Sequence, residues 1–371
     1  MNSHKEKFDI IIVGAGISAI LTALALSKEG KNVLIIEKSS YIGGNCRTYE
    51  IDGFNVDTGP HAITDLQNGP LKILIKKYFS VVPRFLPFGG YFVRYQNKLQ
   101  EFPLTLIQLA RFDILSKRDR ILLSGALIDA VANSSLNKRI LDQSVFEFIK
   151  KYNPSSKSVK FLDAVCYFLS GKSIYKTPTW RILGGSGYVN EDDNSAASHF
   201  RKFIKIAMQD YSTQGYPIGG IQNITSCAIN SFPKNKVTIR TNEEVLELIT
   251  KDNRAIGIKS DKRLYDSDTV VYSGFVKDLP KLTRSLPKKY VAELNKIEQA
   301  KSFTIWLGLK KKLPSISYIG SEIYFDSDSP YWAMPTSNLD ASLAPKNKQL
   351  IGFTTIFDKE CYEKQLHALK A

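Results

Sequence analysis

The residues with the clearest chemistry stand near the N-terminus, in the segment FDIIIVGAGISAILTALALSKEGKNVLIIE that begins at Phe8. Gly14, Gly16 and Ala19 form the pattern GxGxxA directly after an apolar run. Gly14 permits a tight turn, Gly16 lets a pyrophosphate approach the backbone, and the small Ala19 lets a helix lie close to the strand. A helix N-terminus also offers free N–H groups and a partial positive charge. The pattern predicts a binding site for the diphosphate of a dinucleotide.

Three elements must position this turn. Residues 9–13 are expected to form a buried parallel strand, residues 17–29 a helix, and residues 32–36 a second strand that finishes on Glu37. Glu37 follows Gly14 at close to the ~20-residue offset at which an acidic side chain hydrogen-bonds an adenosine ribose. The same carboxylate would repel a 2′-phosphate. A plain βαβ core without a ligand is the alternative, which this order of elements makes the less favoured interpretation.

A second glycine turn, SSYIGGNCRT, occupies residues 39–48. Gly43 and Gly44 allow another close backbone approach, and Arg47 offers a forked, permanently charged donor to a phosphate. An ordinary loop closed by a surface arginine is the alternative. The position directly after the first motif favours a role in the same site.

A hairpin with its turn at Asp52-Gly53 is expected next, and the tight turn Gly59-Pro60-His61 follows it. His61 is the only histidine near a recognisable motif. A histidine beside a turn has either a structural role or a place in the site, and both interpretations stay open.

The rest of the chain predicts an α/β protein in which a Rossmann-like dinucleotide-binding domain carries an inserted α+β substrate domain. Residues 1–68 and 215–287 are assigned to the binding domain, residues 69–214 to a helix-rich insert, and residues 288–371 to a strand-rich second part of the insert. Further expected features are a strand-like break at 91–102, a loop at 184–194 with a solvent-facing acidic trio, a helix start at 215–222, strands and a hairpin over 237–273, a helix at 288–300, strands at 303–309, 322–332 and 350–357, and a helical tail at 359–371.

Composition excludes several classes of protein. Four scattered cysteines without a CxxC pattern indicate reduced thiols and neither disulfides nor a metal site. The net charge is +15, from 51 basic and 36 acidic residues, and the basic residues are spread along the chain. The sequence contains no nucleic-acid-binding motif. The polar N-terminus resembles no signal peptide, and no apolar run reaches the ~20 residues of a membrane span. We therefore expect a cytoplasmic chain, at most peripheral to the inner face of the membrane, with no nucleic-acid partner.

Taken together, these motifs resemble FAD-dependent oxidoreductases of the superfamily that holds phytoene desaturases, protoporphyrinogen oxidases and flavin amine oxidases. The resemblance spans most of the chain and implies FAD in an extended pose, with its adenosine ribose on Glu37 and Arg47 at the phosphates. It also implies that the turn at Gly59 lies toward the flavin ring. The residues that it assigns to FAD are Gly14, Gly16, Ser18, Ala19, Glu37, Lys38, Gly43, Gly44, Arg47, Gly59, Pro60, His61 and Val245, whose backbone would meet the adenine.

One feature of that superfamily is not found in the sequence. Its members end with a strand, loop and helix that carry a Gly-Asp pair and pack on the diphosphate and isoalloxazine, and no such segment follows residue 357. The chain is therefore expected to be truncated or split, with a complementing chain or dimer partner, or to lack this element.

Three functions follow from these patterns. The first is an FAD-dependent oxidoreductase that takes a hydride from an apolar, isoprenoid or amine-type small molecule. The second is a flavin-dependent UDP-sugar mutase, for which Arg84, Arg94, Arg111 and Arg181 are the candidate diphosphate clamps. The third is a non-catalytic subunit that needs a partner to complete the flavin site. No catalytic acid, base or nucleophile can be assigned from the sequence. Some amine oxidases place a lysine near the flavin, but the local context of Lys301 does not match well enough to carry that role over.

Overall fold

The computed structural model describes residues 6–59, 62–136, 142–184, 214–252, 254–299, 301–326 and 330–357. Pro60, His61, most of the expected loop at 184–194 and the expected tail helix at 359–371 lie outside these residues. The chain forms two compact units, residues 1–86 with 216–299 and residues 87–215 with 300–371. The units change after residues 86, 215 and 299, whereas the sequence placed domain boundaries after residues 68, 214 and 287.

The first unit is built on a six-stranded sheet in the order β10-β11-β12-β1-β2-β9. Its strands are β1 (Glu6–Val13), β2 (Val33–Ile36), β9 (Val237–Arg240), β10 (Val245–Lys251), β11 (Arg254–Ser260) and β12 (Leu264–Tyr272). β12, β1, β2 and β9 run parallel, while β10 and β11 are added as an antiparallel hairpin. β2 is buried along its whole length, as the apolar sequence VLII of a strand covered on both faces requires. This sheet is the Rossmann-like sheet that the sequence predicts.

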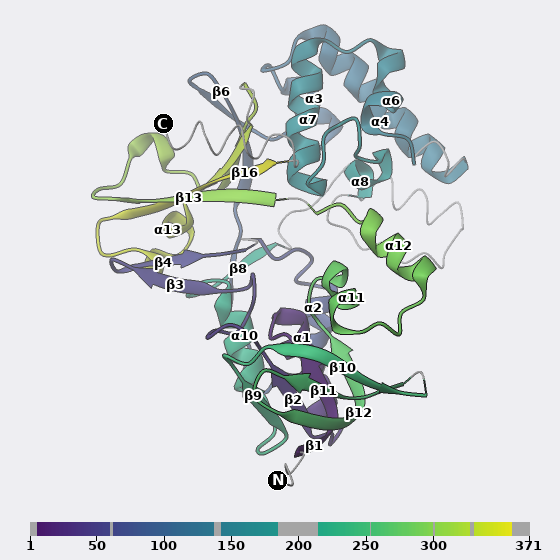
Figure 1. Cartoon of the computed structure of the whole chain (residues 1–371). Helices are drawn as coiled ribbons and strands as arrows, with labels where there is room; N and C mark the ends of the chain where they lie inside the picture. Colours follow the sequence, from purple (N-terminus) through teal and green to yellow (C-terminus); the bar gives the residue numbers. More distant parts are fainter. Residues whose placement is uncertain are drawn as a thin grey trace, which may run out of the picture. The chain divides into compact units, whose positions relative to one another are not determined.

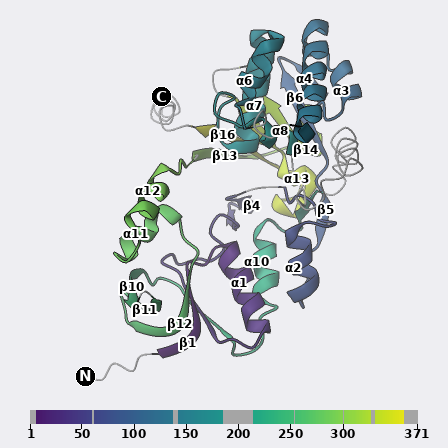
Figure 2. The same cartoon turned by 90° about the vertical axis from the view of Figure 1, so that its right-hand side faces the viewer.

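Helices cover one side of this sheet, and Figure 2 shows α1 (Ile17–Lys28), α10 (Gln222–Ile229) and α2 (Pro70–Tyr78) next to one another there. Ile20 and Leu24 of α1 pack with Ala228 of α10 and with Tyr78 at the end of α2. The remaining elements of the first unit are the hairpin β3 (Thr48–Ile51) and β4 (Phe54–Asp57), the short helices η3 (Val276–Asp278) and α11 (Leu279–Leu282), and α12 (Lys288–Lys296). A short two-stranded sheet pairs β5 (Phe85–Pro87) with β8 (Gly215–Pro217).

The second unit contains a six-stranded sheet in the order β13-β16-β15-β14-β6-β7. Its strands are β6 (Gly90–Tyr95), β7 (Lys98–Glu101), β13 (Lys301–Leu309), β14 (Gly320–Tyr324), β15 (Tyr331–Met334) and β16 (Gln349–Phe357). The single strand expected at 322–332 is wrong, because β14 and β15 are separate antiparallel strands. The turn-forming residues Asp326 and Pro330 interrupt the apolar pattern between them.

Helices of the second unit gather beside this sheet (Figure 1). They are α3 (Leu106–Arg111), α4 (Lys117–Leu136), α6 (Val145–Ile149), η1 (Lys150–Tyr152), α7 (Ser156–Ser170) and α8 (Thr179–Gly184), with η4 (Pro314–Ile316), α13 (Thr336–Leu339) and η5 (Ala341–Leu343) among the later strands. Val93 and Ile323 of the sheet share a buried core with Phe161 of α7. One face of the sheet is therefore covered by the helices.

Candidate cofactor site

The first glycine turn has the backbone that a dinucleotide turn requires. Gly14 adopts a φ of 97°, and a Cβ at this position would lie 3.2 Å from the Ser273 carbonyl oxygen at the end of β12. Its amide donates to the Ile36 carbonyl at 2.7 Å, which joins the turn to the tip of β2. Gly14 is therefore required by the protein's own backbone.

Gly16, the N-cap of α1, lies in open space. A Cβ placed on Gly16 would meet no atom within 4 Å, and its φ of −68° is one that any residue adopts. The first intrahelical bond runs from the Ile20 amide to the Gly16 carbonyl, and no side chain caps the helix. The amides of Ile17, Ser18 and Ala19 consequently have no intrahelical acceptor. With the exposed Ser18 and the buried Ala19, this helix start fits a bound diphosphate.

Glu37 directly follows β2, with its carboxylate turned back on the glycine turn. Oε2 accepts from the Ala15 amide and Oε1 from the Ser39 amide, both at 2.8 Å. An ionised carboxylate has about four acceptor positions, so lone pairs remain for ribose hydroxyls. Lys38 beside it is exposed. The Glu243 amide donates to the Glu37 carbonyl at 3.0 Å, which brings the start of β10, at the 8% exposed Val245, to the same sheet edge.

The second glycine turn packs directly on the first. The Gly43 amide donates to the Ala15 carbonyl at 2.7 Å, and Gly16 and Gly43 form a parallel bridge. A Cβ on Gly44 would lie 3.3 Å from the Gly16 Cα. The structure thus brings together the two glycine motifs that the sequence placed in one site.

Arg47 is held by aromatic rings. Its guanidinium lies 4.0 Å from the ring centroid of Tyr41 and 5.2 Å from that of Tyr49. In the described chain no carboxylate forms an ion pair with Arg47, so the charge stays available for an anionic ligand. Gly59 fits closely against the Asn45 carbonyl, where a Cβ would collide. The described part of the Gly59-Pro60-His61 turn therefore lies against the second glycine turn.

Asp57 is a residue of this region to which the sequence interpretation gave no role of its own. It is 2% exposed and accepts hydrogen bonds from Thr48 Oγ1 at 2.6 Å, the Ile221 amide at 3.1 Å and the Tyr216 hydroxyl at 2.5 Å. The only signal in the sequence is an acidic residue that closes a strand directly before a glycine turn. Burial, together with the charge of Asp57, raises the pKa of the Cys46 thiol to about 12, which keeps this thiol protonated near neutral pH.

The arginines considered as diphosphate clamps are in part already engaged. Arg94 donates from Nε and Nη2 to the carboxylate of Glu322 at 2.7–2.9 Å, and Nε of Arg181 donates to the Leu169 carbonyl at 3.0 Å. Arg84 and Arg111 are exposed. Lys301 is the exposed first residue of β13. Two of the four candidate arginines are therefore already bonded within the protein, and the other two are exposed.

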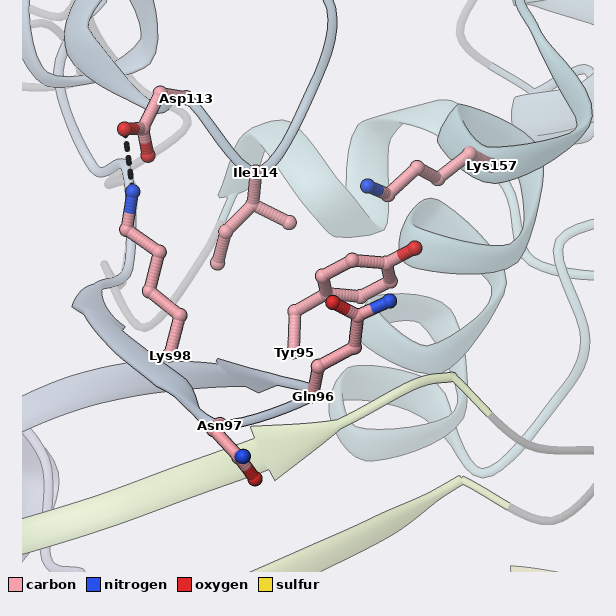
Figure 3. Close-up of a pocket in the computed structure, with 7 residues that line it drawn as sticks. All are labelled: Tyr95, Gln96, Asn97, Lys98, Asp113, Ile114 and Lys157. Atoms are coloured by element: carbon pink, nitrogen blue, oxygen red, sulfur yellow. Dashed lines mark hydrogen bonds and ion pairs between the residues drawn. The ribbon is translucent and has the colours of Figure 1, made fainter.

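A depression of about 440 Å³ lies in the second unit, between the β6–β7 turn and the helices (Figure 3). Its cationic side chains are already engaged, because Lys98 pairs with Asp113 and Lys157 lies 3.5 Å from the ring centroid of Tyr95. We assign no chemistry to it. Among the residues that the structure describes, no group of three potential metal ligands is present, and no helix is long and apolar enough to cross a membrane.

Comparisons with known proteins agree with this geometry. Residues 12–78 match the family model of the NAD(P)-binding Rossmann-like domain. An uncharacterized protein of Methanothermococcus thermolithotrophicus, encoded in the nifH2 3′ region, is 48% identical over 26% of this chain and 93% of its own length. Prolycopene isomerase 1 of an Oncidium hybrid cultivar is 22% identical over 98% of this chain, which spans 66% of that relative.

Solved structures extend the likeness to the whole chain. An oxidoreductase from Methanosarcina mazei superposes with a TM-score of 0.78 at 19% identity, covering 98% of this chain and 82% of the other. The chain is therefore similar in fold to FAD-dependent oxidoreductases, and residues 12–78 belong to the family of Rossmann-like dinucleotide-binding domains. A reduced UDP-galactopyranose mutase has a TM-score of 0.66 at 17% identity, covering 95% of this chain and 75% of the other. This fold is therefore shared by different activities, while the open helix start at Gly16 fits the diphosphate of FAD.

Proposed function

We propose that this chain is an FAD-dependent oxidoreductase that takes a hydride from an apolar, isoprenoid-like small molecule. The observation that carries the proposal is the arrangement around Gly16, which we call the cradle. Here the amides at the start of α1, the Glu37 carboxylate and the second glycine turn lie together. Bound FAD supplies a hydride acceptor that the side chains of the protein cannot provide. The alignment with prolycopene isomerase over 98% of the chain supports an isoprenoid over an amine-type substrate.

In this proposal the residues of the chain hold and orient the cofactor. The amides that follow Gly16 bind the diphosphate, and Arg47 adds a charged donor beside it. Glu37 accepts from the adenosine ribose, and the backbone at Val245 meets the adenine. Lys38 stays near the ribose, while the turn at Gly59, with Pro60 and His61, faces the flavin ring.

A UDP-sugar mutase is the second candidate, and the ion pair of Arg94 argues against it. A mutase of this kind needs arginines that clamp a sugar diphosphate, but Glu322 already accepts two donors of Arg94 in a bidentate contact. Releasing Arg94 would leave the 4% exposed Glu322 without its partner, which is costly for a buried carboxylate. The oxidoreductase is therefore the better supported function.

Peripheral contact with an anionic membrane is part of the same proposal, since an isoprenoid substrate dissolves in lipid. Residues 66–100 contain no aspartate or glutamate. On the outer side of α2 the exposed Ile73 stands among Lys72, Lys76 and Lys77, and the following residues Val81 and Val82 are 42% and 57% exposed. We call residues 72–84 the α2 surface. Aliphatic side chains among lysines suit insertion between anionic head groups.

The test is an absorbance spectrum of the purified chain before and after addition of FAD. Flavin bands that remain with the protein through gel filtration would support an autonomous flavoprotein. Anaerobic bleaching by an apolar polyene, with no binding of UDP-galactopyranose, would favour the oxidoreductase over the mutase. A colourless protein that cannot be reconstituted would overturn the proposal and point to a subunit that needs a complementing chain.

A further inference from the structure

Asp57 ends β4 inside the first unit and is not among the residues proposed to touch FAD. Its two carboxylate oxygens accept from donors in different elements: Oδ1 from Thr48 Oγ1 on the paired strand β3 and from the Ile221 amide, Oδ2 from the Tyr216 hydroxyl. Tyr216 is fully buried. A carboxylate taken out of water in this way is stable only with such donors.

The position of this carboxylate relative to α10 is informative. Ile221 is the N-cap of α10, so Asp57 occupies the N-terminus of that helix, where an anion is stabilised. The next residue completes the closure, because the Gln222 amide donates to Thr48 Oγ1 and Gln222 Oε1 accepts from the Thr48 amide, both at 3.1 Å. In α1, by contrast, the N-cap Gly16 has no side chain and the helix start is open.

The second glycine turn of the cofactor site is tied to this cluster. Thr48 directly follows Arg47, and the amide of Thr58, next to Asp57, donates to the Arg47 carbonyl at 2.9 Å. Gly220, with a φ of 103°, packs so closely on Thr48 that a Cβ would collide with its hydroxyl. A displacement of α10 would therefore move the backbone on either side of Arg47.

We propose that Asp57 is a positioning residue of the cofactor site: its buried carboxylate fills the N-terminus of α10 and fixes the Gly43–Arg47 turn that closes on the open start of α1. The inference rests on the proposed function, because the site that it positions is the FAD site. Within one unit, one helix start is thus closed by the protein and the other is left for the cofactor.

Asp57→Asn tests this role while keeping the shape of the side chain. The amide still accepts at Oδ1, but its nitrogen cannot accept from Tyr216, so the buried hydrogen bond between the two side chains is lost. We expect the Kd for FAD to rise about tenfold, the size of one lost buried hydrogen bond. Tyr216→Phe should weaken FAD binding less, and Asp57→Asn/Tyr216→Phe no more than Asp57→Asn, because both changes remove the same contact.

The matched control is Asp119→Asn in the second unit. Asp119 is also a buried carboxylate, 3% exposed, that accepts from Ser116 and Ser155. It should lower stability without changing the Kd for FAD. Asp57→Ala with added sodium formate gives a second test, because the small carboxylate fits the vacated position and should restore part of the affinity.

Hydrogen exchange of the FAD-free protein keeps this test independent of the proposed function. Asp57→Asn should speed exchange at residues 43–48 and 219–222 and leave residues 33–36 unchanged. Unchanged exchange in these segments, or an FAD Kd within twofold of the wild type, would overturn the positioning role. A wild type that binds no FAD would contradict the proposed function, while the exchange data would still decide whether Asp57 holds the turns.

Discussion

At the scale of single residues, Gly16 and Gly43 are glycines for different physical reasons. Gly43 has a φ of 103°, and a Cβ there would lie 2.7 Å from the Cys46 carbonyl oxygen. Gly16 has ordinary backbone angles and nothing within 4 Å of the position of a Cβ. The protein itself therefore requires glycine at position 43, whereas no described residue lies close enough to require it at position 16, which fits the proposed contact with the FAD diphosphate.

Gly16→Ala should separate folding from cofactor binding. At an N-cap this change costs at most about 1 kcal/mol of folding stability. The added methyl group occupies the space of the diphosphate, so the Kd for FAD should rise by at least about tenfold. Urea unfolding and fluorescence titration with FAD measure the two effects.

Gly43→Ala provides the opposite pattern. Left-handed backbone and the close Cys46 carbonyl should cost about 2 kcal/mol or more of stability. Gly16→Ala with unaltered FAD binding would show that the cradle is not the diphosphate site.

The same scale shows what a sequence can predict. Gly14, Gly16 and Glu37 could be placed from spacing alone, because a strand, a turn, a helix and a second strand lie within about 30 residues. Asp57 could not, because the donors Tyr216 and Ile221 lie 159 and 164 positions away. Its carboxylate acquires a role only when the fold brings β4 to the start of α10.

At the scale of elements, periodic segments with clear boundaries were the predictable ones. The hairpin turn at Asp52-Gly53 joins β3 and β4 as expected, and the strands over 237–273 are β9 to β12. The expected strand at 322–332 was wrong because aromatic residues continue on both sides of the polar sequence between β14 and β15. The sequence offered Arg94 as a candidate ligand clamp, but the parallel pairing of β6 with β14 places its side chain next to Glu322.

The ion pair between Arg94 of β6 and Glu322 of β14 should contribute to the stability of the second unit. Glu322→Leu leaves the Arg94 guanidinium, whose side chain is 20% exposed, without its carboxylate. We expect a loss of about 3 kcal/mol of unfolding free energy, and Arg94→Leu/Glu322→Leu should recover part of it because no lone charge remains. Urea titration of the single and double variants gives the coupling.

Asp113→Asn is the control for an exposed pair. The side chains of Lys98 and Asp113 are 52% and 55% exposed, so solvent screens the ion pair and we expect no measurable change in the unfolding midpoint. Equal effects of Glu322→Leu and Asp113→Asn would contradict a buried ion pair between β6 and β14.

At the scale of the whole molecule, the net charge of +15 indicates a membrane-binding surface only where lysines stand beside exposed apolar side chains. The inner side of α2 packs through Tyr78 on α1 and α10, so its outer side is free to carry lysines and Ile73. The sequence predicted a helix-rich segment there without showing which side of a helix would be buried. It assigned α2 to the insert, whereas α2 lies in the first unit with the cofactor site.

The α2 surface should direct the protein to anionic membranes. Lys72→Glu/Lys76→Glu places two acids on its exposed side, and each lysine near an anionic head-group layer contributes about 1 kcal/mol of attraction. We expect co-sedimentation with vesicles of phosphatidylcholine and phosphatidylserine to fall at least about tenfold, since two such contributions are lost. Ile73→Ser/Val82→Ser should also reduce binding, but by removing the apolar contact and therefore with little dependence on salt.

Lys288→Glu/Lys289→Glu changes the charge by the same amount at exposed positions of α12 and should leave vesicle binding near the wild-type value. Vesicles of phosphatidylcholine alone should bind the wild type weakly. A loss of binding equal for the α2 and α12 variants would mean that total charge, and not the α2 surface, attracts the membrane. If an acidic protein bound the wild type and anionic vesicles did not, the α2 surface would be a binding site for a protein and not for a membrane.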